Sequence, residues 1–208
     1  MLEVIKKYAV VVVVLVIACA GAIPAHAVTL TFEDLKSICN TTPFEYGYYN
    51  TVIQNGYGGL NWSNFMAIDA PQAYPVSGYT NGRVSGDIVI YNGWADPASV
   101  LQTTAPIVLH SAYLTGAWDD GLRVKADGYL GGVLKYTKTV TLSYYQPTFV
   151  NYGFNNVDRI EWSSLGGTHF AMDNLSYDIA PVPEPSSILT LLCGIGTLGG
   201  LVLRRRSA

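Results

Sequence analysis

The middle of the chain has no pair of cysteines that could form a disulfide. The 208 residues contain three cysteines, of which Cys19 lies near the N-terminus, Cys193 lies near the C-terminus and only Cys39 lies between them. A lone thiol cannot form an intramolecular bridge, and its common role is that of a small buried hydrophobic residue. The middle of the chain must therefore be held by packing or by a bound metal, and a pairing of Cys39 between two chains is the alternative to its burial.

No residue spacing typical of a catalytic site is present. The sequence has no Gly-x-Ser-x-Gly elbow, no His-Glu-x-x-His pair and no glycine-rich phosphate loop before Lys and Ser or Thr. The histidines His110 and His169 each fall inside an expected strand without a partner at ligand spacing, so we predict structural roles for both. Asp119 and Asp120 are neighbours before Gly121, whereas glycosidase carboxylates face each other across a cleft, so we interpret them as a turn. These observations predict a protein that is not an enzyme.

Positive charge is scarce between the two terminal segments. From Val28 to Pro183 the chain carries seven Lys and Arg against thirteen Asp and Glu, a net charge near −6. A nucleic-acid-binding domain needs a basic surface, so this charge argues against that class of function. About 155 residues remain, which is enough for one domain with a hydrophobic core of its own.

The middle of the chain also lacks a sustained helical period. Residues 122–127 alternate between apolar and charged side chains, which predicts a strand with one buried and one exposed face. A second alternating run covers residues 139–144. The apolar run 107–115 is predicted to form a central strand that is covered on both faces.

Turn signals separate these runs. Asp120-Gly121 and Gly131-Gly132 are two of eight glycine-containing turn dipeptides, and they predict consecutive antiparallel hairpins over residues 106–144. Many short strands at this spacing, without helices, predict an all-β fold. We expect an antiparallel β-sandwich of the jelly-roll type over residues 28–180.

The N-terminal segment has the parts of a secretory signal peptide. Two lysines precede an apolar run, and Ala25-His26-Ala27 offers small residues at the positions that a signal peptidase reads. We predict a signal peptide over residues 1–27, with the mature chain starting near Val28. Val16-Ile17-Ala18-Cys19 also fits a loose lipobox, so lipidation of the cysteine is an alternative. An uncleaved anchor is disfavoured because the apolar run is short for a membrane span.

The C-terminal segment, residues 181–208, has three parts in a fixed order. Prolines keep the first part, a Pro-Glu-Pro triplet, out of helices and interior strands. The second part is an uncharged run that would be roughly 24 Å long as a helix, slightly less than a hydrocarbon core, which predicts a single membrane-spanning helix. The third part is an arginine cluster that would stay with the cytoplasmic phosphates and stop transfer. These parts are Pro183, Glu184 and Pro185, then Ile188 to Leu203, then Arg204, Arg205 and Arg206.

This order of parts resembles the PEP-CTERM sorting signal of Gram-negative bacteria. The likeness lies in Val-Pro-Glu-Pro-Ser, a short span that contains glycines, and a basic cluster after it. The resemblance implies recognition by an exosortase, a membrane-embedded cysteine transpeptidase-like enzyme, with processing near the triplet. It also implies export across the inner membrane, a transient membrane anchor, and delivery to the cell surface or matrix in association with exopolysaccharide and biofilm. A plain tail anchor, with the prolines as a linker, is the alternative.

The two ends of the middle domain resemble the opening and closing strands of carbohydrate-binding-module-like jelly rolls. The opening reads Thr31-Phe32-Glu33-Asp34-Leu35, and the closing reads Phe170-Ala171-Met172-Asp173-Asn174-Leu175. The resemblance implies that the first and last strands lie side by side, with a structural calcium there in many members. Glu33, Asp34 and Asp173 are the candidate ligands, because calcium prefers carboxylate and carbonyl oxygens.

Asp173 breaks the pattern of its own strand. It shares parity with Leu175 and Tyr177, so an in-register strand would turn its carboxylate toward the core. A lone inward carboxylate costs several kcal/mol unless it is paired or binds a cation. One alternative is a bulge at Asp173-Asn174, which resets the phase and keeps Phe170 and Met172 inside. Another is an aspartate that hydrogen-bonds a turn.

Aromatic residues are the best functional lead. Flat aromatic rings stack on the C–H faces of sugars, as they do on other apolar ligands. Trp94 and Trp118 lie in turn-like segments and are the candidates for such stacking. Trp162 is predicted to be a core residue, and Trp62 fits either role.

Together these features predict an exported, non-catalytic protein of the cell surface or extracellular matrix. A glycan-binding module of the same fold is the alternative, and a secreted hydrolase is a less favoured one. The expected partners are an exosortase, a signal peptidase, exopolysaccharide and, before processing, the membrane. The one cofactor considered is a structural calcium, and no nucleic acid is expected to bind.

Overall fold

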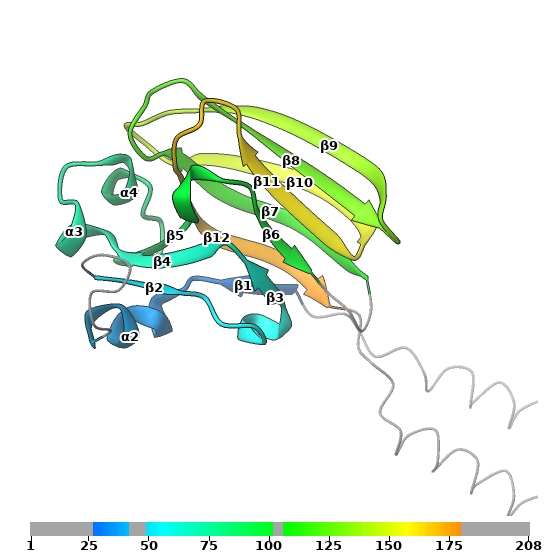
Figure 1. Ribbon diagram of the computed structural model, residues 1–208, viewed down its shortest axis with the longest axis horizontal. Helices are drawn as coiled ribbons and strands as arrows, with labels where there is room; N and C mark the ends of the chain where they lie inside the picture. Colours follow the sequence, from blue (N-terminus) through cyan, green and yellow to red (C-terminus); the bar gives the residue numbers. More distant parts are fainter. Residues whose placement is uncertain (1–26, 42–48, 102–105, 180–208) are drawn as a thin grey trace, which may run out of the picture. The chain divides into compact units, whose positions relative to one another are not determined.

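The computed structural model of the protein describes residues 27–41, 49–101 and 106–179 (Figure 1). The chain divides into two compact units, and all of these residues belong to the unit Pro24–Ala180. Residues 1–26 of the predicted signal peptide, the lipobox cysteine and the whole C-terminal segment predicted from the sequence lie outside the described residues. Within the described residues, no helix has the length and apolar character needed to cross a membrane.

The unit is built from strands that form two antiparallel sheets, sheet A and sheet B. The strands of sheet A are β1 (Ala27–Leu30), β2 (Asn50–Val52), β4 (Phe65–Asp69), β5 (Ile88–Asn92), β7 (Ile107–Gly116), β10 (Thr148–Val157) and β12 (Phe170–Ile179). Those of sheet B are β3 (Asn61–Ser63), β6 (Ala98–Leu101), β8 (Leu122–Leu130), β9 (Val133–Leu142) and β11 (Arg159–Ser164).

The order of the strands confirms the predicted fold class, an antiparallel β-sandwich of the jelly-roll type. Sheet A has the order β10-β7-β12-β5-β4-β2, with β1 paired to β12, and sheet B has the order β3-β6-β11-β8-β9. From β4 onward the chain passes repeatedly from one sheet to the other. The first and last strands lie side by side, because Ala27 to Leu30 pair with Asp178 to Leu175.

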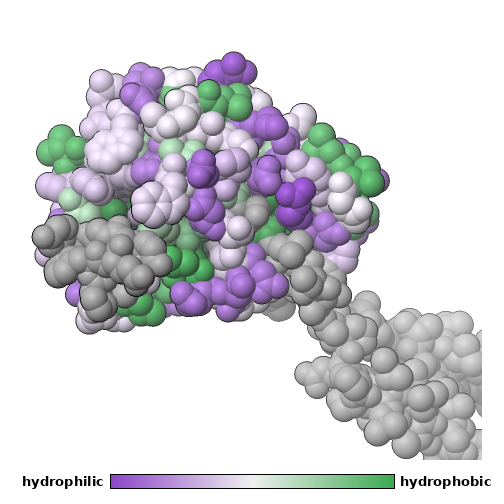
Figure 2. Space-filling view, viewed as in Figure 1, coloured by the Kyte–Doolittle hydropathy of each residue, from purple (hydrophilic) through white to green (hydrophobic). Residues whose placement is uncertain are grey.

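The main core lies between the sheets and contains aromatic and branched aliphatic side chains. Leu122, Val124 and Ala126 of β8 point into it, as their alternation with charged residues predicted. Trp162 is fully buried, as predicted, and Trp62 is nearly so. Both tryptophans are therefore core residues. Figure 2 shows the face of the domain in that view as mostly hydrophilic or neutral, with hydrophobic residues in small separate groups.

Short helices fill several connections, so the expectation of a chain without helices was wrong. They are α2 (Lys36–Thr41), α3 (Ala70–Ala73), α4 (Gly78–Asn81) and the 3-10 turns η1 (Glu33–Leu35), η2 (Tyr57–Gly59) and η3 (Gly93–Ala95). None exceeds six residues, which is too short for a helical period to show in the sequence. Helices α3 and α4 cover part of the outer face of sheet A and close a second, smaller core that includes Ala70, Tyr79, Tyr91 and Ala171.

Of the hairpins predicted over residues 106–144, one is confirmed and one is wrong. Strands β8 and β9 form a hairpin through Gly131-Gly132, as expected. Strands β7 and β8 do not pair, because the segment that contains Asp120-Gly121 carries the chain from sheet A to sheet B. Strand β7 is interior to its sheet, but its outer face is only partly covered, with His110, Ser111 and Tyr113 half-buried.

A bulge at Asp173-Asn174 resets the phase of β12. The register with β7 shifts between Asp173 and Ser176, and Asn174 has a φ of 50°, a left-handed conformation that asparagine tolerates. As a result Phe170 and Met172 before the bulge, and Leu175 and Tyr177 after it, all reach the main core. Both alternatives for Asp173 are observed together, because the residue lies at a bulge and its carboxylate also accepts hydrogen bonds from the bend at Val84 and Ser85.

The sandwich has two distinct ends. Gly116, the last residue of β7, pairs with Phe170, the first residue of β12, and the connections 93–97, 117–121, 143–147 and 165–169 lie at this end, on the left in Figure 1. We call it the loop end. The opposite end, where Ala27 pairs with Asp178 and Ile107 pairs with Ile179, is called the tail end.

Candidate functional site

Asp173 is buried and fully hydrogen-bonded. Its side chain is 0% exposed, and its Oδ2 accepts the backbone N–H groups of Val84 at 2.7 Å and Ser85 at 3.0 Å. Its Oδ1 accepts the Ser85 hydroxyl at 3.0 Å and the Asn174 N–H at 2.7 Å. These four donors satisfy a carboxylate that would otherwise be costly to bury.

Glu33 binds the same segment of the chain from the other side. Its Oε2 accepts the backbone N–H of Asp87 at 3.1 Å, and its Oε1 accepts that of Ile88 at 2.8 Å. Gly86 lies between the two carboxylates with a φ of 127°, and a Cβ at this position would lie 2.4 Å from the Glu33 carboxyl carbon. The opening and closing motifs of the domain thus meet at one segment, residues 84–88, which we call the clamped segment.

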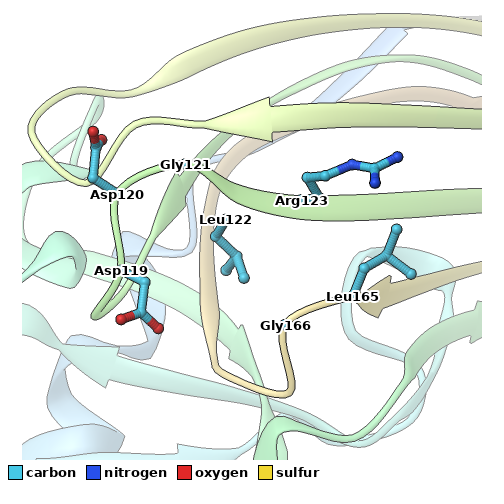
Figure 3. A pocket seen from close by; sticks show the side chains of 7 residues that line it. All are labelled: Asp119, Asp120, Gly121, Leu122, Arg123, Leu165 and Gly166. Atoms are coloured by element: carbon cyan, nitrogen blue, oxygen red, sulfur yellow. The ribbon is translucent and has the colours of Figure 1, made fainter.

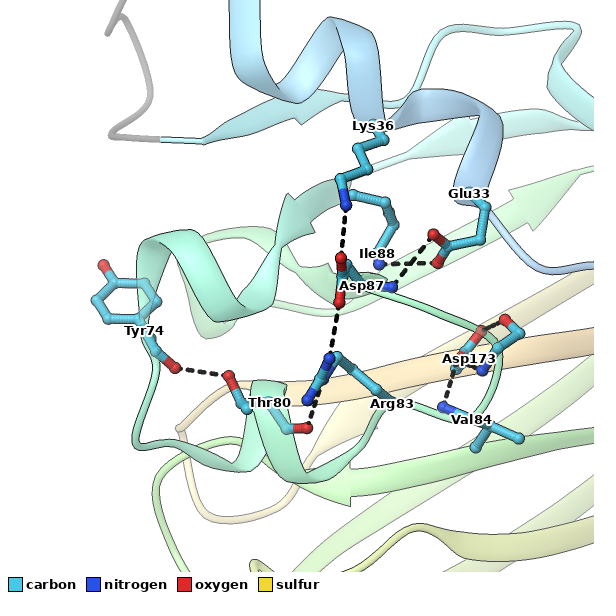
Figure 4. Close-up of polar contacts among 10 residues, drawn as sticks. Glu33, Lys36, Tyr74, Thr80, Arg83, Val84, Asp87, Ile88 and Asp173 are labelled. Carbon is cyan, nitrogen blue, oxygen red and sulfur yellow. Dashed lines mark hydrogen bonds and ion pairs between the residues drawn. The ribbon is translucent and has the colours of Figure 1, made fainter.

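The Asp87 side chain ties this segment to two helical regions. It accepts the ammonium of Lys36 at 2.5 Å and the guanidinium of Arg83 at 2.7 Å, and Arg83 donates to the Thr80 carbonyl at 2.9 Å (Figure 4). The hydrogen bond from Lys36 is the main reason why the pKa of Asp87 is lowered. The two cations therefore keep the Asp87 carboxylate ionised to a lower pH than an isolated aspartate.

The three predicted calcium ligands are not brought together as one set. Asp34 is exposed, and its carboxylate accepts the Tyr57 hydroxyl at 2.7 Å, away from the clamped segment. In the described part of the chain, no three His, Cys, Asp or Glu side chains group closely enough to hold a metal ion. The oxygens of Glu33 and Asp173 are taken by backbone N–H and hydroxyl donors instead. These contacts give the predicted calcium site no support, and calcium binding itself is left to measurement.

Calcium dependence can be measured through thermal stability. Because donors within the protein already satisfy Glu33 and Asp173, we expect the melting temperature of the domain in EGTA to equal that in calcium. Differential scanning calorimetry of residues 24–180 in both buffers checks this. A melting temperature that rises with calcium concentration would contradict it and restore the calcium site, since a cation that binds only the folded state must stabilise it.

Trp118 lies at the loop end and is half-exposed yet firmly packed. Its ring lies 5.1 Å from that of Tyr74 and 5.4 Å from that of Tyr79, edge to face in both cases. Trp118 and Tyr74 are each 44% exposed, whereas Tyr79 is buried. Tyr74 was not singled out from the sequence, where it stands in a turn-like Ala-Tyr-Pro segment without any periodic signal.

A histidine contacts Tyr79, the buried member of the aromatic group formed by Tyr74, Tyr79 and Trp118. The Tyr79 hydroxyl lies 2.6 Å from Nδ1 of His169, and burial lowers the pKa of His169, so the ring is neutral at pH 7. His169 directly precedes β12 instead of lying within it. His110 does lie in a strand, but it has a partner that the sequence did not indicate, because its Nε2 is 2.9 Å from Oδ2 of Asp178.

A surface pocket of about 330 Å³ begins at Asp119, the residue that follows Trp118 in the sequence (Figure 3). Asp119 and Asp120 point away from each other there, and Asp120 accepts the backbone N–H of Tyr144 at 2.9 Å, as a turn residue does. The pocket therefore offers separate polar groups and not a facing carboxylate pair. Its lining consists of Asp119, Asp120, Gly121, Leu122, Arg123, Leu165 and Gly166.

Trp94, the second tryptophan predicted to stack on glycans, is more exposed and less supported. It is 73% exposed and has a φ of 56°, in the left-handed region. The Asn64 side chain holds the backbone of its turn by donating to the carbonyls of Gly93 at 2.8 Å and Pro97 at 3.1 Å. No ring contact of Trp94 with another described residue is found, so both candidates lie at the loop end but only Trp118 is braced.

Cys39 is a core residue, as its isolation in the sequence indicated. It is buried in the main core, and burial raises the pKa of its thiol to about 12. The thiolate, which is the reactive form, is therefore absent at physiological pH.

Comparison with known structures finds likenesses that are weak in both sequence and shape. A carbohydrate-binding module, TmCBM61, solved in complex with β-1,4-galactotriose, is 10% identical, with a TM-score of 0.35 over 64% of this chain and 99% of that chain. A family two carbohydrate esterase from Cellvibrio japonicus is 12% identical, with a TM-score of 0.31 over 59% of this chain and 36% of that chain. No curated protein sequence matches the chain.

The comparison with protein families is specific and concerns the C-terminal segment. Residues 181–206 match the model of the PEP-CTERM protein-sorting motif. The match covers the Pro-Glu-Pro triplet, the uncharged run and the arginine cluster that the sequence singled out. The chain therefore carries a PEP-CTERM protein-sorting motif directly behind its β-sandwich unit, and it is a protein marked for export.

Proposed function

We propose that this is an exported, non-catalytic surface or matrix protein that holds a glycan at the loop end of its sandwich. The sorting motif supports export, and it implies processing by an exosortase before delivery to the surface. The structural matrix role and the glycan-binding role expected from the sequence are compatible, because a matrix protein needs a hold on its polysaccharide.

The observation that carries the proposal is that the Trp118 ring is both exposed to solvent and held in place by neighbouring rings. Tyr74 and Tyr79 fix its ring in place while 44% of the side chain stays open to solvent. A ring that is already fixed loses little conformational freedom when a sugar stacks on it. The adjoining pocket adds the Asp119 and Arg123 side chains, which can exchange hydrogen bonds with sugar hydroxyls.

The position of the loop end supports the same proposal. The sorting motif starts at residue 181, two residues after β12 ends at Ile179, and β12 ends at the tail end. The C-terminal end of β12 and the aromatic group thus lie at opposite ends of the sandwich. A surface protein that reaches for an external polymer needs this arrangement.

The polar contacts of the described residues support a binding role over a hydrolytic one. His169 contacts the hydroxyl of a buried tyrosine, and His110 contacts Asp178 on the outer face of sheet A. Asp119 and Asp120 diverge, so they do not form the facing carboxylates of a glycosidase.

Substitution of Trp118 tests the proposed site. We expect residues 24–180 to bind glycans on an array and in polysaccharide pull-downs, and Trp118→Ala to weaken that binding about tenfold through loss of one stacked ring. Trp118→Phe should keep most of the binding. Tyr49→Ala removes an exposed aromatic ring that lies apart from the loop end, and it serves as the matched control.

Two outcomes would count against this proposal. If Trp118→Ala bound the same glycans as the wild type, the loop end would not be the site. If the folded wild-type domain bound no glycan, only the structural role would stand.

A further inference from the structure

Phe149 is an exposed aromatic residue on the face of sheet A, near the start of the edge strand β10. It lies in β10, it is 56% exposed, and its ring centroid is 5.1 Å from that of Tyr113 on the neighbouring strand β7. The adjacent residues Val150 and Ala112 pair with each other and point into the main core. Because side chains alternate along a strand, both aromatic rings lie on the outer face of sheet A.

The next row of the same face consists of amide and hydroxyl side chains. Asn151 on β10 pairs with Ser111 on β7, Ser111 pairs with Ser176 on β12, and Ser176 pairs with Thr29 on β1. Neighbouring strands lie about 4.8 Å apart, so these groups form a ladder across four strands. We call the two aromatic rings and this ladder the outer strip.

The charged groups around the outer strip lie at its margins and already have partners. Asp173, which pairs with Tyr113, is taken up by the clamped segment, and His110 at the tail end pairs with Asp178. Lys138 reaches over the open edge and donates to the Asn151 carbonyl at 2.5 Å. The interior of the strip is therefore uncharged.

The outer strip is separate from the aromatic group at Trp118. Helix α4 lies against the end of β7, where the Gly78 N–H donates to the Ala117 carbonyl at 2.9 Å. The Asn81 side chain of the same helix donates to the Tyr144 carbonyl at 3.0 Å, on the loop that leads into β10. The helix thus contacts both the turn that carries Trp118 and the loop that leads into β10, and the two surfaces share no residue.

The chemistry of the strip disfavours a second protein chain as its occupant. Two rings offer far less apolar area than the roughly 800 Å² that each partner buries in a stable interface. Strand β10 is an edge, but it has register shifts and positive φ values of 62° at Gly153 and 57° at Asn156. Such bulges disrupt the regular ladder that an added strand would need.

We propose that the outer strip is a second glycan site, which takes an extended stretch of an uncharged polysaccharide. Phe149 and Tyr113 stack on sugar rings, while Asn151, Ser111 and Ser176 exchange hydrogen bonds with hydroxyl groups. The inference goes beyond the site at Trp118, because it rests on different residues on a different surface. A domain with both sites can hold two polysaccharide strands at once.

Affinity electrophoresis tests this proposal. Residues 24–180 form a compact unit with both sheets and both cores, and they can be run in native gels that contain hydroxyethyl cellulose, galactan or mannan as neutral probes. We expect retardation in at least one neutral gel, about tenfold weaker binding for Phe149→Ala, and near wild-type binding for Phe149→Trp. Alginate is the charged probe, in which Phe149→Ala should migrate like the wild type.

Three controls separate this site from the one at Trp118. Val133→Ala shortens an exposed apolar side chain at the start of β9 and should leave the retardation unchanged. Trp118→Ala leaves the outer strip intact, so it should still show the retardation that depends on Phe149. Circular dichroism should show that all variants are folded. Retardation of Phe149→Ala equal to the wild type, or no retardation of the wild type in any neutral gel, overturns the second site. If Trp118→Ala is the only variant that loses retardation, the second site is overturned as well and the site at Trp118 is retained.

Discussion

Replacing Asp173 by asparagine should lower the free energy of unfolding by about 3 to 5 kcal/mol. The buried carboxylate accepts four hydrogen bonds, two of them from the backbone N–H groups of Val84 and Ser85. An amide has one accepting oxygen, so its NH₂ group would face a backbone donor without water to relieve the conflict. Thermal or urea unfolding of residues 24–180 measures the loss, and we expect a drop in melting temperature of about 10 °C.

The matched control is Asp34→Asn, which makes the same chemical change at an exposed carboxylate. Asp34 accepts a single hydrogen bond from the Tyr57 hydroxyl, so its replacement should cost less than about 1 kcal/mol. Equal stability of the Asp173 and Asp34 variants would show that the clamped segment does not depend on the buried carboxylate.

Replacing Gly78 by alanine should be at least as damaging, at about 3 kcal/mol or more. A Cβ at Gly78 would lie 1.7 Å from the carbonyl oxygen of Gly116 and 2.9 Å from the Cα of Ala117. Both neighbours are backbone atoms of the interior strand β7 and the turn after it, so helix α4 would have to lift off the sheet. Tyr79 follows Gly78 directly, so Trp118 would lose its support and glycan binding at the loop end should fall with stability.

Gly166→Ala is the control for this substitution. Its Cβ would meet only the flexible end of the Leu122 side chain at 2.9 Å, so the expected loss is below about 1 kcal/mol. Unfolding curves together with near-ultraviolet circular dichroism of the tryptophans would report both effects. An unfolding curve of Gly78→Ala that matched the wild type would show that α4 can shift without cost.

The parts of the fold that follow from local patterns could be predicted from the sequence. The alternation in residues 122–127 is decided by neighbours along the chain, and β8 has the predicted faces. The bulge at Asp173 was one of the alternatives because the apolar residues before and after it differ in phase. The sorting motif could also be predicted, since its features stand in fixed order along the sequence.

Other features depend on contacts between distant residues. A turn dipeptide such as Asp120-Gly121 shows that the chain reverses, but not which sheet the next strand joins, and β8 joins the opposite sheet. The three carboxylates proposed to bind calcium could not be distinguished by residue type, although two find backbone donors and the third finds a tyrosine.

The two surfaces proposed to bind glycans differ in how visible they are in the sequence. Trp118 was identified, but its brace Tyr74 lies 44 positions earlier and meets it only through the packing of α3 and α4. Phe149 had a signal that was overlooked. Val150, Tyr152 and Phe154 alternate along β10 and all point inward. Phe149 has the opposite parity, so its exposure on the outer face could have been anticipated.

The pairing of the first and last strands has a mechanical consequence. Strand β12 lies between β7 on one side and β5 and β1 on the other, and its C-terminal end leads to the sorting motif. Tension between a tethered tail and a polymer gripped at the loop end would run along this strand. Because ladder hydrogen bonds in antiparallel sheets are perpendicular to the strands, that load would shear many bonds together instead of opening them one at a time. A pull on the C-terminal end of the domain would therefore load the hydrogen bonds of β12 in shear.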